Sequence, residues 1–319
     1  MKILVYGAGV LGSLYAARLK ESGQDVTVLA RGKRFDEIEG QGIVLEHALK
    51  GTRSVTPVEV TKDLKPDDCY DLVLVVMRRD QVAGVLPALA ASRKTALVVF
   101  MVNNPLGYGE WLNAVGRDRL LVGFAGAGGT RVEGVVYYHV VSRLLQPTTF
   151  GEPGGGVTER VKTLARVFKR AGFPTAVCSD MDAWQKTHVA WASAIANGLY
   201  MAGGSGDALA SRPEVVRLTV LAIREGFAVL RALGIPVTPG KLKAFERIPL
   251  PLLVAVLRAW ARTKHFDTIA TRHTLAAFDE MEMVSTDFQS LARSTTASTP
   301  ALDTLHAGLA NWTGSPRAR

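Results

Sequence analysis

The sequence predicts an α/β protein of two domains, in which a parallel-sheet domain is followed by an all-helical one. The chain has 319 residues, and this length fits two domains of about 150 residues each. In the first half, short apolar runs alternate with helical patterns, which is typical of a parallel sheet with crossover helices. Beyond residue 180 only long helical patterns remain. We therefore expect a first domain over residues 1–178 and a second over residues 179–319.

Composition and charge exclude several classes of protein. Hydrophobic residues make up 48% and charged residues 21% of the chain, a balance that excludes disorder. The two cysteines, Cys69 and Cys178, are too few for a disulfide framework, so we expect a reducing, cytoplasmic environment. The net charge of +9 is dispersed and contains no block of five basic residues. Nucleic acid is therefore not an expected partner.

No segment predicts a membrane span or a signal peptide. The longest apolar run, residues 249–257, is nine residues long, which is about half of what a bilayer requires. The apolar stretch at the N-terminus ends at Gly7, too early for a signal peptide. We expect a small-molecule partner and no metal, and we leave a homodimer open.

Five short apolar runs in the first half, rich in β-branched residues, predict parallel strands. They cover residues 3–6, 25–30, 72–77, 95–101 and 120–124. A helical pattern lies between the first two runs, over residues 9–23, and a weaker one covers residues 80–92. The first domain should then close with three further elements. These are a hairpin of 132–141 and 144–150 joined at Ser142-Arg143, a helix over 157–171 and a strand over 174–178.

The second half contains four long helical patterns and no strand pattern. The patterns cover residues 183–200, 214–233, 251–264 and 271–291. Clusters of glycine and proline separate them. The last residues, 314–319, are expected to fray.

A glycine motif connects the first predicted strand to the first predicted helix. It consists of Gly7, Ala8, Gly9, Val10, Leu11 and Gly12. In such a motif the first glycine permits a tight turn, the second lets a pyrophosphate approach the backbone, and the third packs helix on strand. The anion then lies at the positive end of the helix. The complete strand–turn–helix context predicts a Rossmann-type dinucleotide-binding domain.

The end of the second predicted strand indicates which dinucleotide binds. An NAD site usually has an acidic residue there, which binds the ribose 2′-hydroxyl. This chain has Leu29-Ala30-Arg31-Gly32-Lys33-Arg34 instead, and these cations suit a 2′-phosphate. We therefore expect NADP(H), with Arg31 as its reader. The alternative, a solvated basic loop, applies mainly to Lys33 and Arg34.

In this order, the features resemble those of the ketopantoate reductase family, whose members are NADPH-dependent 2-dehydropantoate 2-reductases. The resemblance rests on the glycine motif, on Leu-Ala-Arg-Gly after the second strand, and on a lysine-bearing helix that opens the helical half. It covers essentially the whole chain. It implies a Rossmann-type domain followed by an all-helical domain, an arrangement like that of 6-phosphogluconate dehydrogenase.

The resemblance assigns a catalytic lysine and two residues near the cofactor. Lys186, in Ala183-Trp184-Gln185-Lys186, matches the family's Trp-x-Lys, whereas in isolation it would be an ordinary surface lysine. Arg78 stands where the family has a lysine that contacts the adenosine phosphate. Asn104, in Asn104-Pro105-Leu106-Gly107, matches the asparagine beside the nicotinamide. Asn103 could take that place, and Asn104 could instead cap a turn.

The resemblance also assigns a substrate-binding glutamate. Counting back twenty residues from Pro300 gives Glu280, with Glu282 as its structural partner. The alternative is an exposed acidic turn of a helix. In this interpretation Lys186 is the general acid, and Glu280 holds a polar group of the substrate.

Other positions depart from the family. Its substrate-binding asparagines, one and two helical turns after the lysine, are replaced by Ala190 and Ala194, and Asn197 is the nearest amide. A family aspartate on the helix before the glutamate is replaced by Arg272, which could bind a substrate carboxylate. A site that hydrogen-bonds a particular group of its substrate rejects analogues that lack this group. Because the asparagines and the aspartate are replaced here, we expect a substrate pocket that is altered and more apolar.

The sequence therefore predicts an NADPH-dependent reductase of a 2-oxo acid, with 2-dehydropantoate (ketopantoate) as the family's default substrate. Two alternatives stay open. One is a reductase of a more apolar ketone or imine. The other is a sensor that binds NADPH without catalysis.

Overall fold

The computed structural model describes residues 1–314 of the chain, with His273 described by its backbone alone. The chain divides into two compact units. Unit 1 consists of Met1–Val102 and Tyr108–Met181, and unit 2 consists of Asn103–Gly107 and the residues from Asp182 onward. The predicted fraying beyond Gly314 falls outside the described residues.

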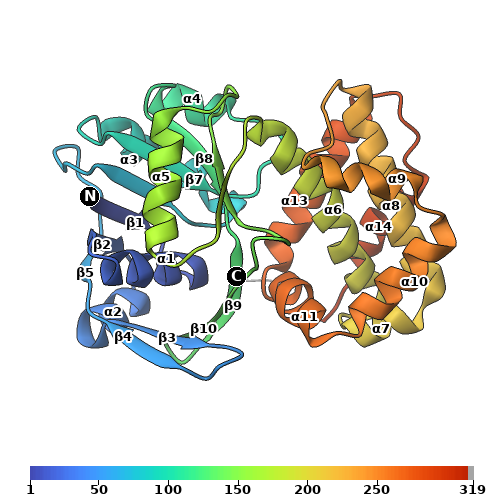
Figure 1. Cartoon of the computed structure of the whole chain (residues 1–319), viewed down its shortest axis with the longest axis horizontal. Coiled ribbons are helices and arrows are strands. Elements are labelled where there is room, and N and C mark those ends of the chain that lie inside the picture. Colours follow the sequence, from blue (N-terminus) through green and yellow to red (C-terminus); the bar gives the residue numbers. More distant parts are fainter. Residues whose placement is uncertain (315–319) are drawn as a thin grey trace. The chain divides into compact units, whose positions relative to one another are not determined.

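An eight-stranded sheet forms the centre of unit 1 (Figure 1). Its strand order is β12-β11-β8-β7-β6-β1-β2-β5. Its strands are β1 (Lys2–Tyr6), β2 (Asp25–Leu29), β5 (Glu59–Thr61), β6 (Leu72–Val75), β7 (Leu97–Met101), β8 (Leu120–Phe124), β11 (Thr148–Gly151) and β12 (Thr175–Val177). Neighbouring strands are parallel except β8 and β11. The apolar runs of the central strands are buried, as expected for parallel strands covered on both faces.

The helices of unit 1 follow these strands in the chain. They are α1 (Val10–Glu21), α2 (Lys33–Gln41), α3 (Leu86–Ala91), α4 (Gly109–Val115) and α5 (Glu159–Arg170). Tyr15 of α1 meets the rings of Phe168 and Phe173 edge-on, with centroids 5.3 and 4.9 Å away, so α1 and α5 share one core. The helix predicted over residues 80–92 is shorter. Two 3₁₀ turns, η1 (Arg79–Gln81) and η2 (Ala83–Val85), precede α3.

A second sheet, with strand order β4-β3-β10-β9, contains the hairpin of this unit. Its strands are β3 (Ile43–His47), β4 (Arg53–Thr56), β9 (Ala127–Val132) and β10 (Val135–Val140). The predicted hairpin of 132–141 and 144–150 is wrong, because the chain turns at Glu133-Gly134, where φ is 49° and 82°. Positive φ at both turn residues matches the right-handed twist of paired strands. The residues predicted as the second arm contain β11, which pairs with β8.

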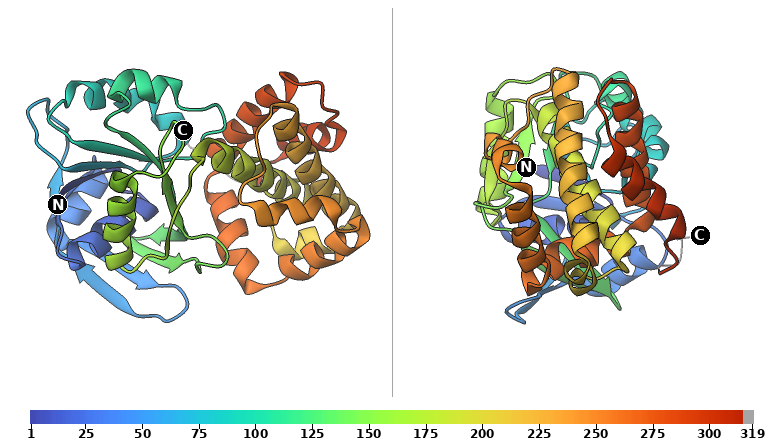
Figure 2. Two further views of the ribbon diagram at one scale, coloured as in Figure 1. Left: turned by 45° about the horizontal axis from the view of Figure 1, so that its top comes forward. Right: turned by 90° about the vertical axis from the view of Figure 1, so that its right-hand side faces the viewer.

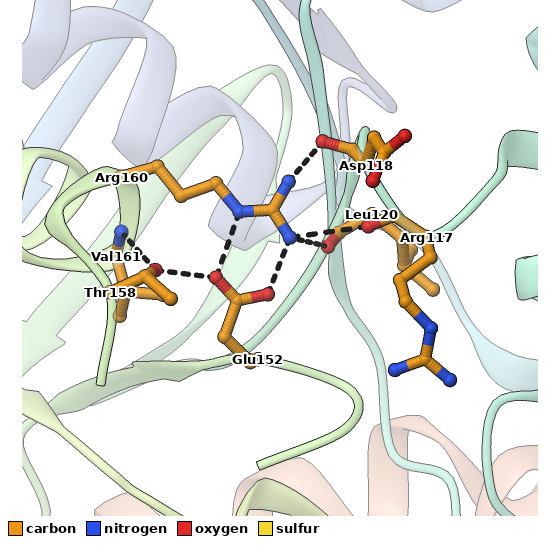
Figure 3. A network of polar contacts seen from close by, with 7 residues as sticks. All are labelled: Arg117, Asp118, Leu120, Glu152, Thr158, Arg160 and Val161. Carbon is orange, nitrogen blue, oxygen red and sulfur yellow. Dashed lines mark hydrogen bonds and ion pairs between the residues drawn. The ribbon is translucent and has the colours of Figure 1, made fainter. Parts of the chain in front are cut away.

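A network of polar contacts fixes the connection between β11 and α5 (Figure 3). The Arg160 guanidinium binds both carboxylate oxygens of Glu152, at 2.8 and 2.5 Å. It also donates to the backbone carbonyls of Arg117, Asp118 and Leu120, at the start of β8. Burial acts to raise the pKa of Glu152, but hydrogen bonds from Arg160 and Thr158 outweigh it and hold that pKa below its ordinary value.

The described residues of unit 2 form helices and loops, with no strand among them. Its helices are α6 (Met181–Ala202, whose first residue counts in unit 1), α7 (Gly206–Ser211), α8 (Pro213–Ala232), α9 (Ala244–Arg247), α10 (Leu250–Ala261), α11 (Lys264–Phe266), α12 (Arg272–Ala276), α13 (Phe278–Arg293) and α14 (Pro300–Ala307), with short segments η3 (Gly240–Lys243), η4 (Asp267–Thr271) and η5 (Gly308–Asn311). The helix predicted over 271–291 is interrupted at Ala277, where φ is −133°. None of the helices in residues 1–314 is long and apolar enough to cross a bilayer.

The core of unit 2 is formed by apolar faces of α6, α8, α10, α13 and α14. Phe227 of α8 and Phe288 of α13 are fully buried within it. Helix α14 lies against α8 (Figure 2). There Glu225 of α8 accepts hydrogen bonds from the backbone nitrogens of Ala301 and Leu302, at 3.1 and 2.8 Å. Its carboxylate thus caps the N-terminus of α14.

Candidate active site

The glycine motif forms the turn between β1 and α1. Gly7 has φ of +121°, and a Cβ there would overlap the carbonyl oxygen of Val76. A Cβ on Gly12 would overlap the carbonyl oxygen of Gly7, so the helix packs closely on the turn. A Cβ on Gly9 would meet no atom within 4 Å, and the first turn of α1 contains no acidic residue. Open space before unpaired helix amides suits a pyrophosphate.

A group of cations lies where β2 and its neighbour β5 end. Arg31 is exposed, and its Nε donates to the backbone oxygen of Lys62 at 3.4 Å. The Lys62 ammonium lies 4.4 Å from the centre of the Phe35 ring. Lys33, at the start of α2, is 3.9 Å from Glu37 and exposed. This edge of the sheet is therefore positively charged.

Arg34 has a structural role that the sequence did not predict. Its side chain is 8% exposed, so it is not part of a solvated loop. The guanidinium donates to the Ala8 carbonyl in the glycine motif at 3.2 Å and to Ser13 Oγ of α1 at 2.9 Å. It also reaches Glu37 and the Gly134 carbonyl. Arg34 thus ties the glycine turn to α2 and to the β9–β10 hairpin.

Arg78 follows β6 on the same side of the sheet as the glycine turn. Its guanidinium forms an ion pair with Asp80 at 3.0 Å, and its side chain is half-buried. A carboxylate therefore already compensates part of the charge that the family resemblance assigns to a cofactor phosphate.

The loop Asn103–Gly107 follows β7 but belongs to unit 2. Asn104 is buried, and its amide donates to the carbonyl of Gly107 at 2.6 Å. The same side chain accepts from the nitrogen of Leu106 at 3.2 Å. Both ends of the amide are therefore used to close the loop, which is the turn-capping alternative considered for Asn104.

Asn103, the neighbouring amide, contacts the predicted substrate-binding residue. Its Nδ2 donates to Oε1 of Glu280 at 3.2 Å. Glu280 is 7% exposed, in the first turn of α13, so it does not lie on an exposed acidic turn. The structure thus brings Asn103 and Glu280 together, and gives Asn104 a different partner.

Lys186 lies on the second turn of α6 and is paired with an acid one turn earlier. Its ammonium binds Oδ2 of Asp182, and its side chain is only 11% exposed. The i, i+4 spacing directs the lysine toward the N-terminal end of the helix. A Cβ on Gly107 would lie 3.7 Å from Asp182 Oδ1, so the loop Asn103–Gly107 lies beside this pair.

The two alanines at the family's asparagine positions face the helical core. Ala190 and Ala194 are 0% and 1% exposed and belong to the apolar core of unit 2. A Cβ on Gly226 of α8 would lie 3.0 Å from the Cβ of Ala190. Helices α6 and α8 therefore approach closely at this position, which leaves no room for an amide.

Asn197 joins a buried polar chain across three helices. Its Nδ2 donates to Ser285 Oγ of α13 at 2.8 Å, and Ser285 Oγ lies 2.9 Å from Nδ1 of His306 on α14. Ser285 Oγ donates to Nδ1 of His306 or accepts from it, depending on the tautomer of the imidazole. The amide of Asn197 is therefore used to join helices α6 and α13.

Three further residues of the helical unit have partners away from the loop Asn103–Gly107, namely Arg272, Trp191 and Tyr200. Arg272 is 58% exposed and pairs with Asp267 at 2.9 Å. Trp191 packs against Phe245 and Trp260, and Tyr200 packs against Phe278 and Trp312. Trp184 stacks on His188 with ring centroids 5.4 Å apart.

Sequence reasoning missed two residues of interest, Asp182 and Lys62. The i, i+4 spacing of Asp182 and Lys186 was a usable signal for the first. No local signal pointed to Lys62, because the three-residue strand β5 was not predicted.

The glycine turn, the parallel sheet and the helical unit define a two-domain protein with a Rossmann-type fold, a class that contains many dehydrogenases. Residues 3–155 match the family described as ketopantoate reductase PanE/ApbA. These residues are just under half of the chain, and over them the match confirms the resemblance to this family that was inferred from the sequence.

Several relatives are named 2-dehydropantoate 2-reductase, among them proteins from Mesorhizobium japonicum and Pyrococcus horikoshii. The protein from Mesorhizobium japonicum is 28% identical over 209 residues, which are 58% of this chain and 63% of that protein. The chain thus matches less than two thirds of the length of that relative. The protein from Pyrococcus horikoshii is 23% identical over 274 residues, or 81% of this chain and 80% of that one.

Solved structures confirm the predicted fold class. 2-Dehydropantoate 2-reductase from Methylococcus capsulatus has a TM-score of 0.75 at 23% identity, over 96% of this chain and 95% of that one. A ternary complex of D-mandelate dehydrogenase with NADH and anilino(oxo)acetate has a TM-score of 0.76 at 14% identity, over 98% and 97%. At these identities the likeness shows the fold alone.

Proposed function

We propose that the chain is an NADPH-dependent reductase of a 2-oxo acid, with 2-dehydropantoate as the default substrate. The family match and the names of these relatives support this proposal. The observation that carries it is the Lys186–Asp182 pair of α6, beside the loop that also anchors Glu280 through Asn103. A buried ammonium and a buried carboxylate in one unit provide a proton donor and a polar anchor.

The residues of unit 1 fit a nicotinamide dinucleotide. The open space at Gly9 and the first turn of α1 suit the pyrophosphate. Arg31 supplies a cation for the 2′-phosphate, and Arg78 stands near the adenosine side of the cofactor. When bound, the reduced nicotinamide supplies a hydride to the carbonyl carbon of the substrate.

Lys186 acts as the general acid of this reaction. Reduction of a carbonyl places negative charge on oxygen, and the Lys186 ammonium donates a proton to that oxygen. The carbonyl gains one hydride and one proton and becomes an alcohol, and the neutral amine then regains a proton from water. Asp182 holds the ammonium at the N-terminal end of α6. Because the Lys186 side chain is largely buried, the Asp182 carboxylate is the partner that compensates the charge of its ammonium.

Glu280 holds a hydroxyl or other donor group of the substrate, and Asn103 orients the carboxylate through its 3.2 Å hydrogen bond. Asn104 keeps the loop closed, so that Asn103 stays directed at Glu280. In this arrangement Asn104 supports the site through the shape of the loop.

A more apolar ketone or imine is the second candidate substrate. The observation that favours it is that two buried alanines, Ala190 and Ala194, stand where the family has amides, so these positions offer a substrate no side-chain hydrogen bond. The structural likeness to D-mandelate dehydrogenase, solved with anilino(oxo)acetate, adds an aromatic 2-oxo acid to the compounds worth testing.

The test is steady-state oxidation of NADPH with a panel of carbonyl compounds. The panel contains 2-dehydropantoate, a short aliphatic 2-oxo acid, an aryl 2-oxo acid, a neutral ketone and a cyclic imine. We expect turnover of at least one 2-oxo acid. Turnover of the neutral compounds alone would favour the second candidate. Tight NADPH binding with no turnover of any compound would favour the sensor.

A further inference from the structure

We infer that Lys62 is a second reader of the 2′-phosphate, which it binds together with Arg31. The inference rests on the proposed preference for NADPH and extends it to a residue outside the second strand and its loop. It depends on the position of β5, the short strand that ends immediately before Lys62.

The sheet brings the two side chains to one edge. Strands β2 and β5 are parallel neighbours, and Leu29 is opposite Thr61 in their register. Parallel strands end at the same edge of a sheet, where ligands of this fold bind. The nitrogen of Ala30 donates to the carbonyl of Thr61 at 3.0 Å, and Arg31 Nε donates to the carbonyl of Lys62 at 3.4 Å. The backbone thus holds Lys62 beside Arg31.

Arg31 and Lys62 are both exposed, and within residues 1–314 neither forms an ion pair with a carboxylate. The other cations of this edge are already engaged. Lys33 lies 3.9 Å from Glu37, and Arg34 is buried and bound to Glu37 and Ser13. The two remaining cations match a phosphate monoester, which carries a charge of about −1.5 to −2 at neutral pH.

Phe35 restricts where the Lys62 ammonium can lie. The ammonium is 4.4 Å from the ring centre, and such a cation–π contact contributes modestly at an exposed site. It keeps the charge on the side of the sheet edge where α2 begins, without neutralising it. A purely structural role for Lys62 would be limited to this contact, and it would not distinguish between cofactors that differ by one phosphate.

The experiment compares cofactors and half-cofactors in binding titrations, which need no substrate. Lys62→Ala, Arg31→Ala and the double variant are titrated with NADPH, NADH, adenosine 2′,5′-bisphosphate and AMP. Lys65→Ala, which removes an exposed cation three residues further along the same loop, is the matched control. Each variant is also checked for an unchanged melting temperature.

For Lys62→Ala we expect Kd for NADPH and for the bisphosphate to rise about tenfold, the usual effect of removing a charged hydrogen bond. Kd for NADH and AMP should stay nearly unchanged, and Lys65→Ala should leave all four values nearly unchanged. Because both cations bind one phosphate, the two single effects should not add in the double variant.

The outcomes separate this inference from the proposed cofactor. If Arg31→Ala weakens NADPH selectively while Lys62→Ala weakens neither cofactor or both equally, the inference about Lys62 is overturned and the preference for NADPH stands. If Lys65→Ala weakens the binding of NADPH as much as Lys62→Ala does, the effect comes from general surface charge, and the inference about Lys62 is wrong. If the unmodified protein binds NADH as tightly as NADPH, both proposals are wrong.

Discussion

Asn103 and Glu280 are 177 positions apart in the sequence and are joined by a hydrogen bond of 3.2 Å within one compact unit. The loop that carries Asn103 follows β7 of the sheet, yet it packs with the helices. The buried carboxylate of Glu280 therefore receives its donor from a segment that precedes the rest of unit 2 in the chain by some seventy-five residues. The loop Asn103–Gly107 therefore brings a polar group of the candidate site to the helices of unit 2.

Replacing each of the two neighbouring asparagines should separate their roles. Asn103→Ala removes the donor to Glu280, and we expect kcat/KM to fall about tenfold, the usual cost of losing a hydrogen bond to a charged group. Asn104→Ala leaves the Gly107 carbonyl and the Leu106 nitrogen without their partner and should lower stability by about 1–3 kcal/mol. Steady-state kinetics and denaturant unfolding measure the two effects. The reverse pattern would make Asn104 the residue that contacts substrate or cofactor.

Lys186→Ala should lower kcat by about 10²–10⁴, the range that general acid catalysis contributes. NADPH binding, measured by fluorescence titration, should change little, since the residue belongs to unit 2. Lys186→Arg should not restore activity, because a guanidinium does not release its proton. If the alanine variant keeps more than about a tenth of kcat, Lys186 is not the proton donor.

Asp182→Asn should lower kcat about tenfold with little change in KM, because it removes the charged partner that holds the Lys186 ammonium. Asp182→Glu should recover part of the loss. The control is Glu214→Gln, which removes an acid from the first turn of α8 and its pair with Arg212. An equal effect in the control would mean that only the stability of a helix end is being measured.

Ala190→Asn should destabilise the protein without improving the use of 2-dehydropantoate. The added atoms would enter the close contact with Gly226, and overpacking of this kind costs about 1–3 kcal/mol. Ala255→Asn, at an exposed position of α10, controls for the lower helix propensity of asparagine. A stable Ala190→Asn protein with faster turnover of 2-dehydropantoate would show that this position faces the substrate.

His306 should make the stability of the protein depend on pH. Burial lowers its pKa below 6.5, and the nearby Arg293 adds to this, whereas Glu282 and Asp303 act in the opposite direction. Well above pH 6.5 the ring is neutral in both folded and unfolded chains. As the pH falls further, the unfolded chain takes up the proton first, so stability is lost. The melting temperature of the protein relative to His306→Gln should therefore decrease between about pH 7.5 and 5.5. A constant difference would contradict this.

Much of the fold could be predicted because its signals are local. The glycine motif restricts the turn after β1 by backbone geometry alone, and the apolar runs of the central strands are buried on both faces. The predicted position of the hairpin was wrong because its turn is Glu133-Gly134. This pair is a weaker turn signal than Asn-Gly, Asp-Gly or Gly-Gly, the pairs that usually mark such turns. Strand β5 was missed because three residues do not form a pattern.

The candidate site could be predicted only in part. The resemblance pointed to Lys186 and Glu280, and the helical spacing of Asp182 could have shown its pairing. The contact between Asn103 and Glu280 could not be read from the sequence, because it depends on which compact unit the loop joins. The close packing at Ala190 could not be predicted for a similar reason, because it depends on Gly226 of another helix.

The loop Asn103–Gly107 also limits how the protein can be divided or recombined. A fragment that begins at Asp182 would contain Glu280 but not its donor, and would expose the part of α6 on which the loop lies. A chimera that takes its helical half from a relative by a single crossover near Met181 would join the loop of one parent to the α13 of the other. Recombination that keeps these contacts needs three crossovers, at the two ends of the loop and near Met181, so that the five residues of the loop come from the same parent as the helices they pack against.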